Sequence, residues 1–373
     1  MENFSLADIK KKNYADVYHC IYQNAAISNQ QISNSLSMSR PTVTQHINTL
    51  LQEHLIEDCG QLDSQIGRKA KGYQIIPDAR VAIGIEILAS RVSIVGLNLY
   101  GQVLEYKRIP LAFSSDETYA LKLSLEVEHF INDSSIDAKC ILGIGLGIQG
   151  LVSEDGTQIR YGKILDCTGL TIELFQNHLK YPCCFIHDAE CSAMSELWEH
   201  PETEDAVFFS LGYHLGGAMI VNGKIHSGRT GRSGTFEHMT LHPNGLPCYC
   251  GQKGCVDSYC SVNALLKDGE TLDEFFEKKK KQDSKVLACW DTFLGHLALA
   301  INNLHMTFDC NVILGGQLAA YITEEDLAYL HQRIREITAF PEEDAFVFSG
   351  KSKKHVVPIG AALPYIKTFL EEI

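Results

Sequence analysis

The stretch HMTLHPNGLPCYCGQKGC, residues 238–255, carries the strongest local signal in the sequence. It sets one histidine and three cysteines at short intervals, and these are His238, Cys248, Cys250 and Cys255. Three thiolates and one imidazole match the tetrahedral N and S ligand set that zinc prefers. Four protein ligands leave no open coordination position, so we expect a structural zinc ion and not one that activates water. His242 and Cys260 are the alternative ligands if one of the four does not bind.

Length and composition describe a globular protein with a substantial core. The chain has 373 residues, of which 45% are hydrophobic and 21% are charged, and this length predicts two to three domains. No apolar run approaches the roughly 18 residues that cross a bilayer, and the N-terminus lacks a secretory signal pattern. We therefore expect a cytoplasmic protein without a membrane partner, whose 13 cysteines are mostly free thiols or metal ligands.

The net charge of −14 argues at first against nucleic acid as a partner, because DNA attracts basic surfaces. The charge is unevenly distributed along the chain, however. Residues 1–78 hold seven Lys and Arg against eight Asp and Glu, a net charge of −1, whereas residues 79–373 carry −13. The acidity therefore belongs to the C-terminal part, and the charge does not exclude DNA binding by the N-terminal part.

The N-terminal 78 residues predict three helices followed by a β-hairpin. The first helix is expected over residues 13–23, the second from a Ser-x-x-Gln capping box at Ser28 through Leu36, and the third from Arg40 to about His54. Two short helices at this spacing and a hairpin with a basic tip, residues 67–71, are typical of a winged helix-turn-helix that binds DNA. A small protein-interaction domain with a solvated basic loop is the alternative.

The third predicted helix has one apolar face and one polar face without negative charge. Val43, Ile47, Leu50 and Leu51 recur at helical spacing and predict the buried stripe. The opposite face carries hydroxyl and amide side chains, which suit the edges of bases in a major groove. The predicted DNA contacts are Arg40, Thr42, Gln45 and Thr49 from this helix and Arg68 from the tip of the hairpin.

The rest of the sequence contains an internal repeat. A pattern of three strands with a tight turn occurs over residues 81–107 and returns over residues 206–226, and strands alternate with helices after each copy. Two such units predict an α/β fold of the two-lobed actin-like (ribonuclease H-like) type, with a ligand cleft between the lobes. Asp188 lies between an apolar strand and a helix, where α/β folds place ligand-facing residues. Its carboxylate is either a partner for a ligand hydroxyl or a helix N-cap.

Together these features resemble the ROK family, named for repressor, open reading frame and kinase. The resemblance rests on the winged-helix start, the Cys-rich loop with the preceding GRTGRSGTFEHM, the segment 186–188 and the strand and turn at 312–316, and it covers nearly the whole chain. Members are sugar kinases or sugar-responsive repressors, and the repressors carry the DNA-binding arm. The family's sugar site implies the following ligand-binding residues here: His187, Asp188, Thr235, Glu237, His238 and Asp257.

Two departures from the family pattern argue against phosphoryl transfer. Where kinases carry Asp-x-Gly-Gly-Thr, residues 86–90 read Glu-Ile-Leu-Ala-Ser, and where a second loop reads Gly-Thr-Gly, residues 212–214 read Gly-Tyr-His. Larger side chains therefore occupy the positions at which a kinase provides space and backbone N–H groups for the phosphates. We therefore expect no catalytic residues and no enzyme activity. Changes at 187, 235, 237 and 257 predict an altered hydroxyl pattern in the ligand, or no sugar at all.

As a whole, the sequence predicts a sugar-responsive transcriptional regulator, most specifically a repressor of carbohydrate uptake or catabolism genes. Residues 1–78 are the expected DNA-binding domain and residues 79–373 the sugar-sensing domain, with lobe one at about 79–188 plus 357–373 and lobe two at about 189–356. The expected partners are operator DNA, a sugar or sugar derivative between the lobes, and further copies in a dimer or tetramer. The alternatives are an ATP-dependent sugar kinase with an appended DNA-binding arm, and a regulator controlled by a protein partner.

Overall fold

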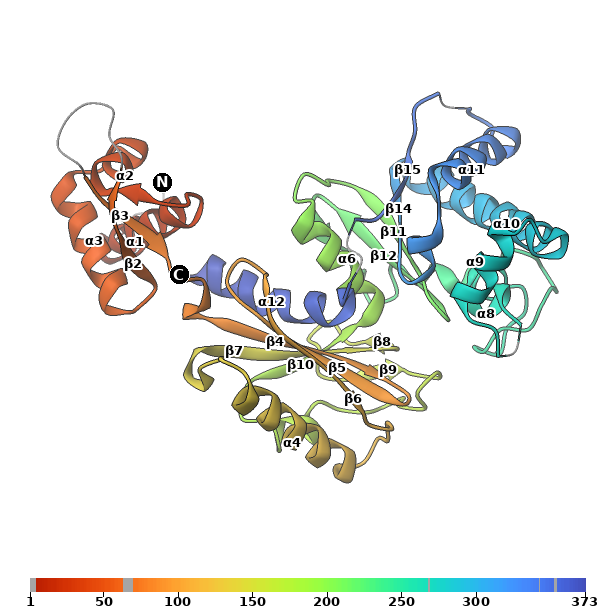
Figure 1. Ribbon diagram of the computed structural model, residues 1–373, viewed down its shortest axis with the longest axis horizontal. Helices are drawn as coiled ribbons and strands as arrows, with labels where there is room; N and C mark the ends of the chain where they lie inside the picture. Colours follow the sequence, from red (N-terminus) through yellow and green to blue (C-terminus); the bar gives the residue numbers. More distant parts are fainter. Residues whose placement is uncertain (1–4, 63–69, 268, 342, 352–353) are drawn as a thin grey trace.

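A computed structural model describes residues 5–62, 70–267, 269–341, 343–351 and 354–373. Three bodies follow one another along the chain: a small N-terminal domain, a lobe that contains strands β4 to β10 (lobe one) and a lobe that contains strands β11 to β15 (lobe two) (Figure 1). The predicted fold class, a winged helix-turn-helix followed by a two-lobed actin-like α/β body, is confirmed. Within the described ranges, no helix is long and apolar enough to span a membrane.

The N-terminal domain packs three helices against a three-stranded sheet of order β1-β3-β2. Its elements are α1 Leu6–Tyr22, β1 Ile27–Ser28, α2 Asn29–Leu36, α3 Arg40–Gln52, β2 Ile56–Leu62 and β3 Ala70–Ile75. Ser28 caps α2 through the predicted capping box. Helix α1 begins at Leu6 and not at residue 13 as predicted, because Ser5 and Asp8 form a second capping box that extends it over three lysines.

Lobe one is a five-stranded sheet of order β10-β7-β4-β5-β6 with a helix on each face (Figure 1). Its strands are β4 Val81–Leu88, β5 Arg91–Leu97, β6 Val103–Pro110, β7 Ile141–Ile148 and β10 Cys183–His187. Helix α4 Glu117–Asp133 covers one face and α12 Val356–Glu372 the other, with the short α5 Glu173–Gln176 before β10. A hairpin of β8 Leu151–Val152 and β9 Ile159–Tyr161 follows β7.

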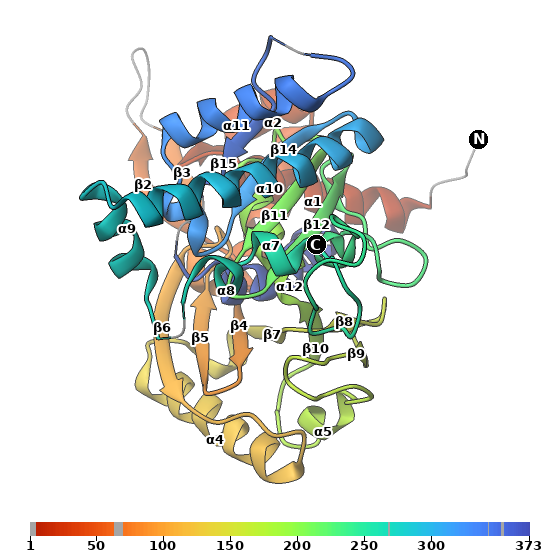
Figure 2. The same cartoon turned by 90° about the vertical axis from the view of Figure 1, so that its right-hand side faces the viewer.

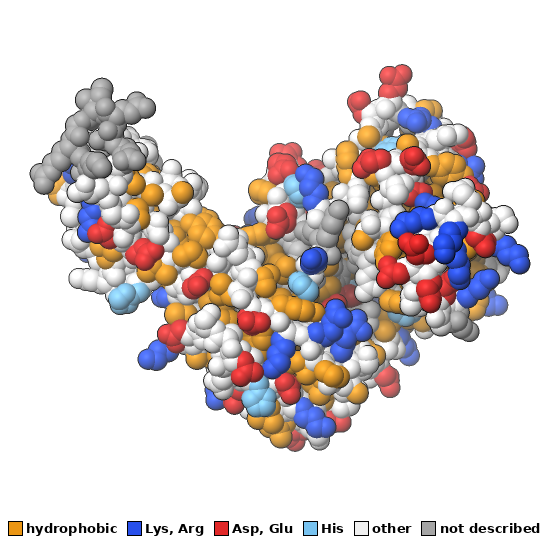
Figure 3. Space-filling view, viewed as in Figure 1, with side chains coloured by type: hydrophobic (Ala, Val, Ile, Leu, Met, Phe, Trp, Pro, Cys, Tyr) orange, Lys and Arg blue, Asp and Glu red, His pale blue; other side chains and the backbone are white. Residues whose placement is uncertain are grey.

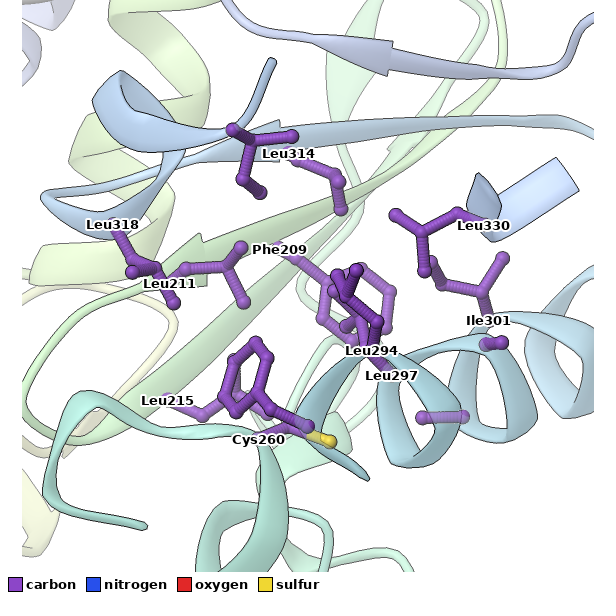
Figure 4. Packing of buried hydrophobic residues seen from close by; sticks show 14 of the residues in the cluster. Phe209, Leu211, Leu215, Cys260, Leu294, Leu297, Ile301, Leu314, Leu318 and Leu330 are labelled. Atoms are coloured by element: carbon purple, nitrogen blue, oxygen red, sulfur yellow. The ribbon is translucent and has the colours of Figure 1, made fainter. Parts of the chain in front are cut away.

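Lobe two repeats this plan in a sheet of order β13-β12-β11-β14-β15. Its strands are β11 Ala206–Leu211, β12 Leu215–Val221, β13 Lys224–Ile225, β14 Asn311–Gly315 and β15 Val347–Ser349, and its helices are α7 Asp257–Cys260, α8 Val262–Leu265, α9 Leu272–Lys280, α10 Ser284–Phe308 and α11 Glu324–Ile337. In both lobes three antiparallel strands are joined by two parallel ones, so the predicted internal repeat is confirmed. Figure 4 shows Leu294 and Leu297 of α10 packed near Phe209 of β11 in the core.

Helix α6, Asp188–Glu199, connects the two lobes and packs against α12. The two helices approach so closely that a Cβ at Gly360 would overlap the carbonyl oxygen of Cys191. Ser195 adds a hydrogen bond from its hydroxyl to the carbonyl oxygen of Val356 at 2.6 Å. Because α12 itself lies on the sheet of lobe one, α6 is held firmly to that lobe.

The far end of α6 reaches the N-terminal domain. Trp198 donates from Nε1 to the carbonyl oxygen of Tyr100 at 3.1 Å, and the Tyr100 ring stacks on Tyr22 of α1 with centroids 4.7 Å apart. The Tyr22 hydroxyl donates to the carbonyl oxygen of Leu99 at 2.8 Å. Hydrophobic side chains, orange in Figure 3, continue from the N-terminal domain across this junction. The N-terminal domain is therefore packed on the body and not merely tethered to it.

Candidate functional site

The Cys-rich loop gathers the four predicted ligands into one cluster. The donor atoms of His238, Cys248, Cys250 and Cys255 all lie within 4.8 Å of one another. The sulfurs of Cys250 and Cys255 are 3.8 Å apart, and Nδ1 of His238 is 3.8 Å from the sulfur of Cys248. A tetrahedral ion with metal–sulfur bonds of about 2.3 Å would set its thiolates roughly 3.8 Å apart. This donor set therefore fits a metal ion.

The two alternative ligands lie outside this cluster. His242 Nε2 is 3.0 Å from His296 Nδ1, and Cys260 is buried in the core of lobe two. The loop closes tightly on itself at Gly254, where φ is +80° and a Cβ would overlap the carbonyl oxygen of His242. Glycine is required there because other residues disfavour this backbone conformation.

A cavity of about 480 Å³ lies between the lobes, beside the metal cluster. Five of the six predicted ligand-binding residues line it, and they are His187, Asp188, Thr235, Glu237 and His238. His238 borders both sites, since its Nδ1 faces the sulfur of Cys248 while its Nε2 lies 3.3 Å from the hydroxyl of Tyr249, another lining residue. Burial lowers the pKa of His238, which favours the neutral imidazole that metals bind.

Asp188 stands at the junction of β10 and α6, at the edge of the cavity. Its Oδ1 accepts a hydrogen bond from the N–H of Ala189 at 2.9 Å and lies 3.3 Å from Nε2 of His187. Burial raises the pKa of Asp188, and the nearby imidazole of His187 opposes that shift. His187 occupies the N-cap position of α6, so Asp188 is the first helical residue and not the cap.

Glu237 offers an unsatisfied carboxyl group to the cavity. Its side chain is 6% exposed, and its Oε2 has no hydrogen-bond partner within the described part of the chain. Burial raises the pKa of Glu237 to about 8. Because an unpaired buried polar atom costs roughly 1–3 kcal/mol, a ligand hydroxyl that reached Oε2 would be stabilising. Thr235 is already engaged, since its hydroxyl donates to the carbonyl oxygen of Arg232 at 2.9 Å.

Asp257 is the predicted ligand residue that does not line the cavity. Its Oδ1 accepts a hydrogen bond from the N–H of Leu215 at 2.8 Å, and its Oδ2 is 3.6 Å from Nδ1 of His214. Asp257 thus fixes the start of β12 and stands behind His214, which does line the cavity. This arrangement could not be predicted from the sequence, because the hydrogen-bonded residues Asp257 and Leu215 are 42 positions apart.

Three cations at the cavity were missed from the sequence. Arg160 in β9, Lys163 just after it and Arg232 in the loop before Thr235 all line the cavity and are exposed. Within the described part of the chain, no Asp or Glu forms an ion pair with any of the three. They lie on a short edge strand and on irregular loops, where no periodicity marks a binding residue.

A second cavity of about 430 Å³ continues from the first, and Gln149, Asp188, Ser210 and His214 line both. Residues 88–90 and Tyr213 form part of its wall. These are the residues that replace the glycines and threonine expected in a kinase. The structure thus brings both altered segments to one cavity that Asp188 also lines.

Helix α3 exposes two of its four predicted DNA contacts. Arg40 and Gln45 are exposed, whereas Thr42 and Thr49 are half-buried. The Thr42 hydroxyl lies 2.8 Å from that of Ser39, and the Thr49 hydroxyl donates to the carbonyl oxygen of Gln45 at 3.2 Å. The two threonines are thus at the sides of the polar face and already hydrogen-bonded.

The centre of that face was missed from the sequence. Thr44 and Asn48 are exposed there, because His46 is buried and shifts the buried stripe of α3 toward residues 46, 47 and 50. Arg68, which the sequence predicts at the tip of the hairpin, lies outside the described residues. Within the described strands of the hairpin, Lys71 pairs with Asp58 at 2.9 Å.

The comparison with known proteins decides the family. A sequence model of the ROK family matches residues 82–362. The chain belongs to the ROK family. A second model, described as winged helix-turn-helix DNA-binding, matches residues 16–57, so this ROK protein carries a DNA-binding domain ahead of the family domain.

Two curated relatives match over more of the chain than the ROK domain alone. The xylose repressor of Caldicellulosiruptor bescii is 24% identical over 354 residues, which cover 88% of each chain. The N-acetylglucosamine repressor of Escherichia coli O6:H1 is 27% identical over 348 residues, which cover 86% of this chain and 83% of that protein.

Two solved ROK structures share the fold. A ROK family transcriptional regulator described as a homologue of the E. coli MLC protein gives a TM-score of 0.77 at 22% identity, with 98% of this chain and 97% of that chain covered. A ROK family glucokinase from Streptomyces griseus, in complex with glucose and AMPPNP, gives a TM-score of 0.66 at 20% identity. That alignment covers 98% of the kinase but 76% of this chain.

The metal cluster makes a prediction about metal content and stability. We expect one metal ion per purified chain, and we expect Cys250→Ser to lose most of it and to lower the melting temperature by several degrees, because metal binding contributes to folding. Elemental analysis and thermal unfolding measure both effects. Cys140→Ser, which changes a cysteine outside the cluster, is the matched control. Full metal content in Cys250→Ser would contradict the assignment.

Proposed function

We propose that this ROK protein is a DNA-binding transcriptional regulator, most specifically a sugar-responsive repressor of carbohydrate uptake or catabolism genes. Residues 1–78 serve as the DNA-binding arm and residues 79–373 as the sensor, and the protein acts in the cytoplasm on operator DNA. The observation that carries the proposal is the packing of a winged helix onto a ROK body whose phosphate loops are replaced. The similarity to two sugar-named repressors over more than 80% of each chain, and to a ROK transcriptional regulator over 98% of this chain, supports it.

In the proposed complex, α3 enters the major groove and presents its exposed polar face to the bases. Arg40, Thr44, Gln45 and Asn48 form that face, and α3 contains no acidic residue that would repel phosphate. Arg68 in the wing contacts a minor groove or phosphates. One winged helix reads a short site, so we propose that a dimer or a dimer of dimers binds a pseudo-palindromic operator.

The effector in this proposal is a sugar or sugar derivative in the cavity beside the metal cluster. Asp188, Glu237 and the Nε2 edge of His238 supply hydrogen-bonding groups in the wall of the cavity. Carboxylates and imidazoles suit hydroxyl groups, which both donate and accept. The proposed metal is a structural zinc ion, which fixes the position of His238 and thereby of the cavity wall.

Helix α6 is the proposed route from the effector to the DNA-binding arm. It begins at Asp188 in the cavity and has Trp198 near its other end, bonded to the turn on which Tyr22 of α1 is stacked. A ligand that binds one arrangement of the lobes more tightly than the other would move lobe two relative to lobe one and to the arm that packs on lobe one. That movement would change the distance between paired recognition helices.

The exposed polar face of α3, here called the reading face, predicts which variants lose sequence-specific DNA binding. With an operator obtained by selection from random DNA, Gln45→Ala should weaken binding by about tenfold or more, because a good base contact contributes roughly 1–3 kcal/mol. Arg68→Ala should lower the salt dependence of binding, as loss of a phosphate contact does. Gln332→Ala, an exposed glutamine on α11, is the matched control. Unchanged specific affinity in both Gln45→Ala and Arg68→Ala at fixed salt would show that the reading face is misplaced.

The contact between Trp198 and Tyr100 predicts a variant that binds the effector and DNA, but whose DNA affinity responds only weakly to the effector. Trp198→Phe keeps an aromatic ring and removes the donor to Tyr100, so we expect near-normal affinity for the effector and for DNA. The change in DNA affinity that the effector causes should fall by about fivefold, which corresponds to a hydrogen bond of roughly 1 kcal/mol. Tyr329→Phe, which removes a hydroxyl bonded to Asp291 on the surface of lobe two, is the control. An unchanged response in Trp198→Phe would remove α6 from the route.

A sugar kinase with an appended arm is the second candidate, and the similarity to the glucokinase structure together with the placement of Asp188 favours it. An assay that couples ADP formation to NADH oxidation, with ATP and a panel of sugars, distinguishes the kinase from the regulator without enzyme activity. We expect no turnover above background, because side chains replace the phosphate-binding glycines and positioning of the phosphates is what kinase catalysis depends on. Sustained turnover that Asp188→Asn abolishes would contradict the regulator-only proposal.

A further inference from the structure

The charges around the cavity beside the metal cluster differ in sign from those of the protein as a whole. The chain carries a formal net charge of −14, yet three permanent cations, Arg160, Lys163 and Arg232, line a cavity that also contains the carboxyl groups of Asp188 and Glu237. None of these three has an acidic ion-pair partner among the residues that the structure describes.

The cations come from both lobes and meet at the cavity. Arg160 and Lys163 belong to the β8–β9 region of lobe one, whereas Arg232 lies in a loop of lobe two. The two segments lie against each other, since a Cβ at Gly231 would come 2.7 Å from the carbonyl oxygen of Val152 in β8. Tyr161 of β9 also reaches lobe two, with its hydroxyl 3.5 Å from the carbonyl oxygen of Cys250. Figure 2 shows the hairpin of β8 and β9 beside the loops of lobe two.

From this arrangement we infer that the effector is an anionic sugar, one that carries a carboxylate or a phosphate group. The inference rests on the proposed sugar-sensing function and adds the chemical class of the ligand. The sugar ring would place its hydroxyls at Asp188, Glu237 and His238, and its anionic group would lie among Arg160, Lys163 and Arg232. Hydrogen bonds between a guanidinium and a carboxylate or phosphate are about twice as strong as neutral ones.

The same arrangement supplies a reason for the lobes to respond to the ligand. Cations of like sign on facing lobes repel each other when no anionic ligand lies between them. An anionic group between them replaces that repulsion with attraction from both sides, so the ligand should bind an arrangement that brings these cations together more tightly than one that separates them. Such unequal affinity for two arrangements is what an effector needs in order to shift their populations.

The test compares matched neutral and anionic sugars by isothermal titration calorimetry on the full-length protein. The neutral probes are glucose, mannose, galactose and N-acetylglucosamine, and the anionic probes are their 6-phosphates together with glucuronate and galacturonate. Inorganic phosphate is titrated separately. We expect at least one anionic sugar to bind at least about tenfold more tightly than its neutral parent, and we expect a high KCl concentration to reduce that difference. The phosphate and carboxylate arms identify which anion the site takes.

Two cavity variants and one control test whether the cations of the cavity cause the preference for an anionic sugar. Arg160→Gln and Arg232→Gln should each reduce the preference for the anionic sugar by about tenfold while leaving the affinity for the neutral parent nearly unchanged. Arg229→Gln changes an exposed arginine of the same loop that does not line the cavity, and it should keep the full preference. All three positions are exposed, so circular dichroism should show unaltered folding.

The outcomes separate this inference from the function on which it rests. A neutral sugar that binds as tightly as its anionic counterpart overturns the inference and leaves sugar sensing intact. Inorganic phosphate that binds as tightly as the sugar phosphates also overturns it, because the cations would then form a site for phosphate alone. Absence of binding by every sugar in the panel would contradict sugar sensing itself.

Discussion

The close packing of α6 against α12 is the constraint on which the rest of the molecule depends. At Gly360 the two helices approach so closely that no side chain fits between them. Helix α12 lies on the sheet of lobe one, and α6 leads from that sheet into lobe two. With 12 residues, α6 spans about 18 Å, and its ends border the cavity at Asp188 and the turn that contacts the N-terminal domain. We propose that a helix held in this way behaves as a rigid element and couples a change at Asp188 to Trp198.

The Cys-rich loop provides a comparable constraint on the other wall of the cavity. It has little regular secondary structure of its own, so its shape is set by the cluster of His238 and three cysteines and by glycines such as Gly254. His238 belongs to both the cluster and the cavity, and the adjacent Glu237 is buried with one oxygen unpaired. In the proposed function, metal ligation and ligand recognition therefore share one short segment, so loss of the metal should disturb both.

Features determined by local chemistry could be predicted from the sequence, and features determined by distant contacts could not. The capping box at Ser28, the internal repeat and the four-residue metal cluster depend on short patterns and were all found. The role of Asp257 depends on a hydrogen bond to Leu215, and the three cations meet only because the lobes face each other. Trp198 and Tyr100 likewise touch across nearly a hundred residues. The predicted start of α1 was wrong for a different reason, because the Ser5–Asp8 capping box is a local pattern that the sequence does contain.

The central claim is that effector and operator bind to one chain whose two sites are energetically coupled. The most direct test measures four affinities on the same protein: for the operator with and without saturating effector, and for the effector with and without saturating operator. Thermodynamic linkage requires the two ratios to be equal. We predict equal ratios of about tenfold or more, with the effector weakening operator binding. An effector that binds free and DNA-bound protein with the same affinity would contradict the claim.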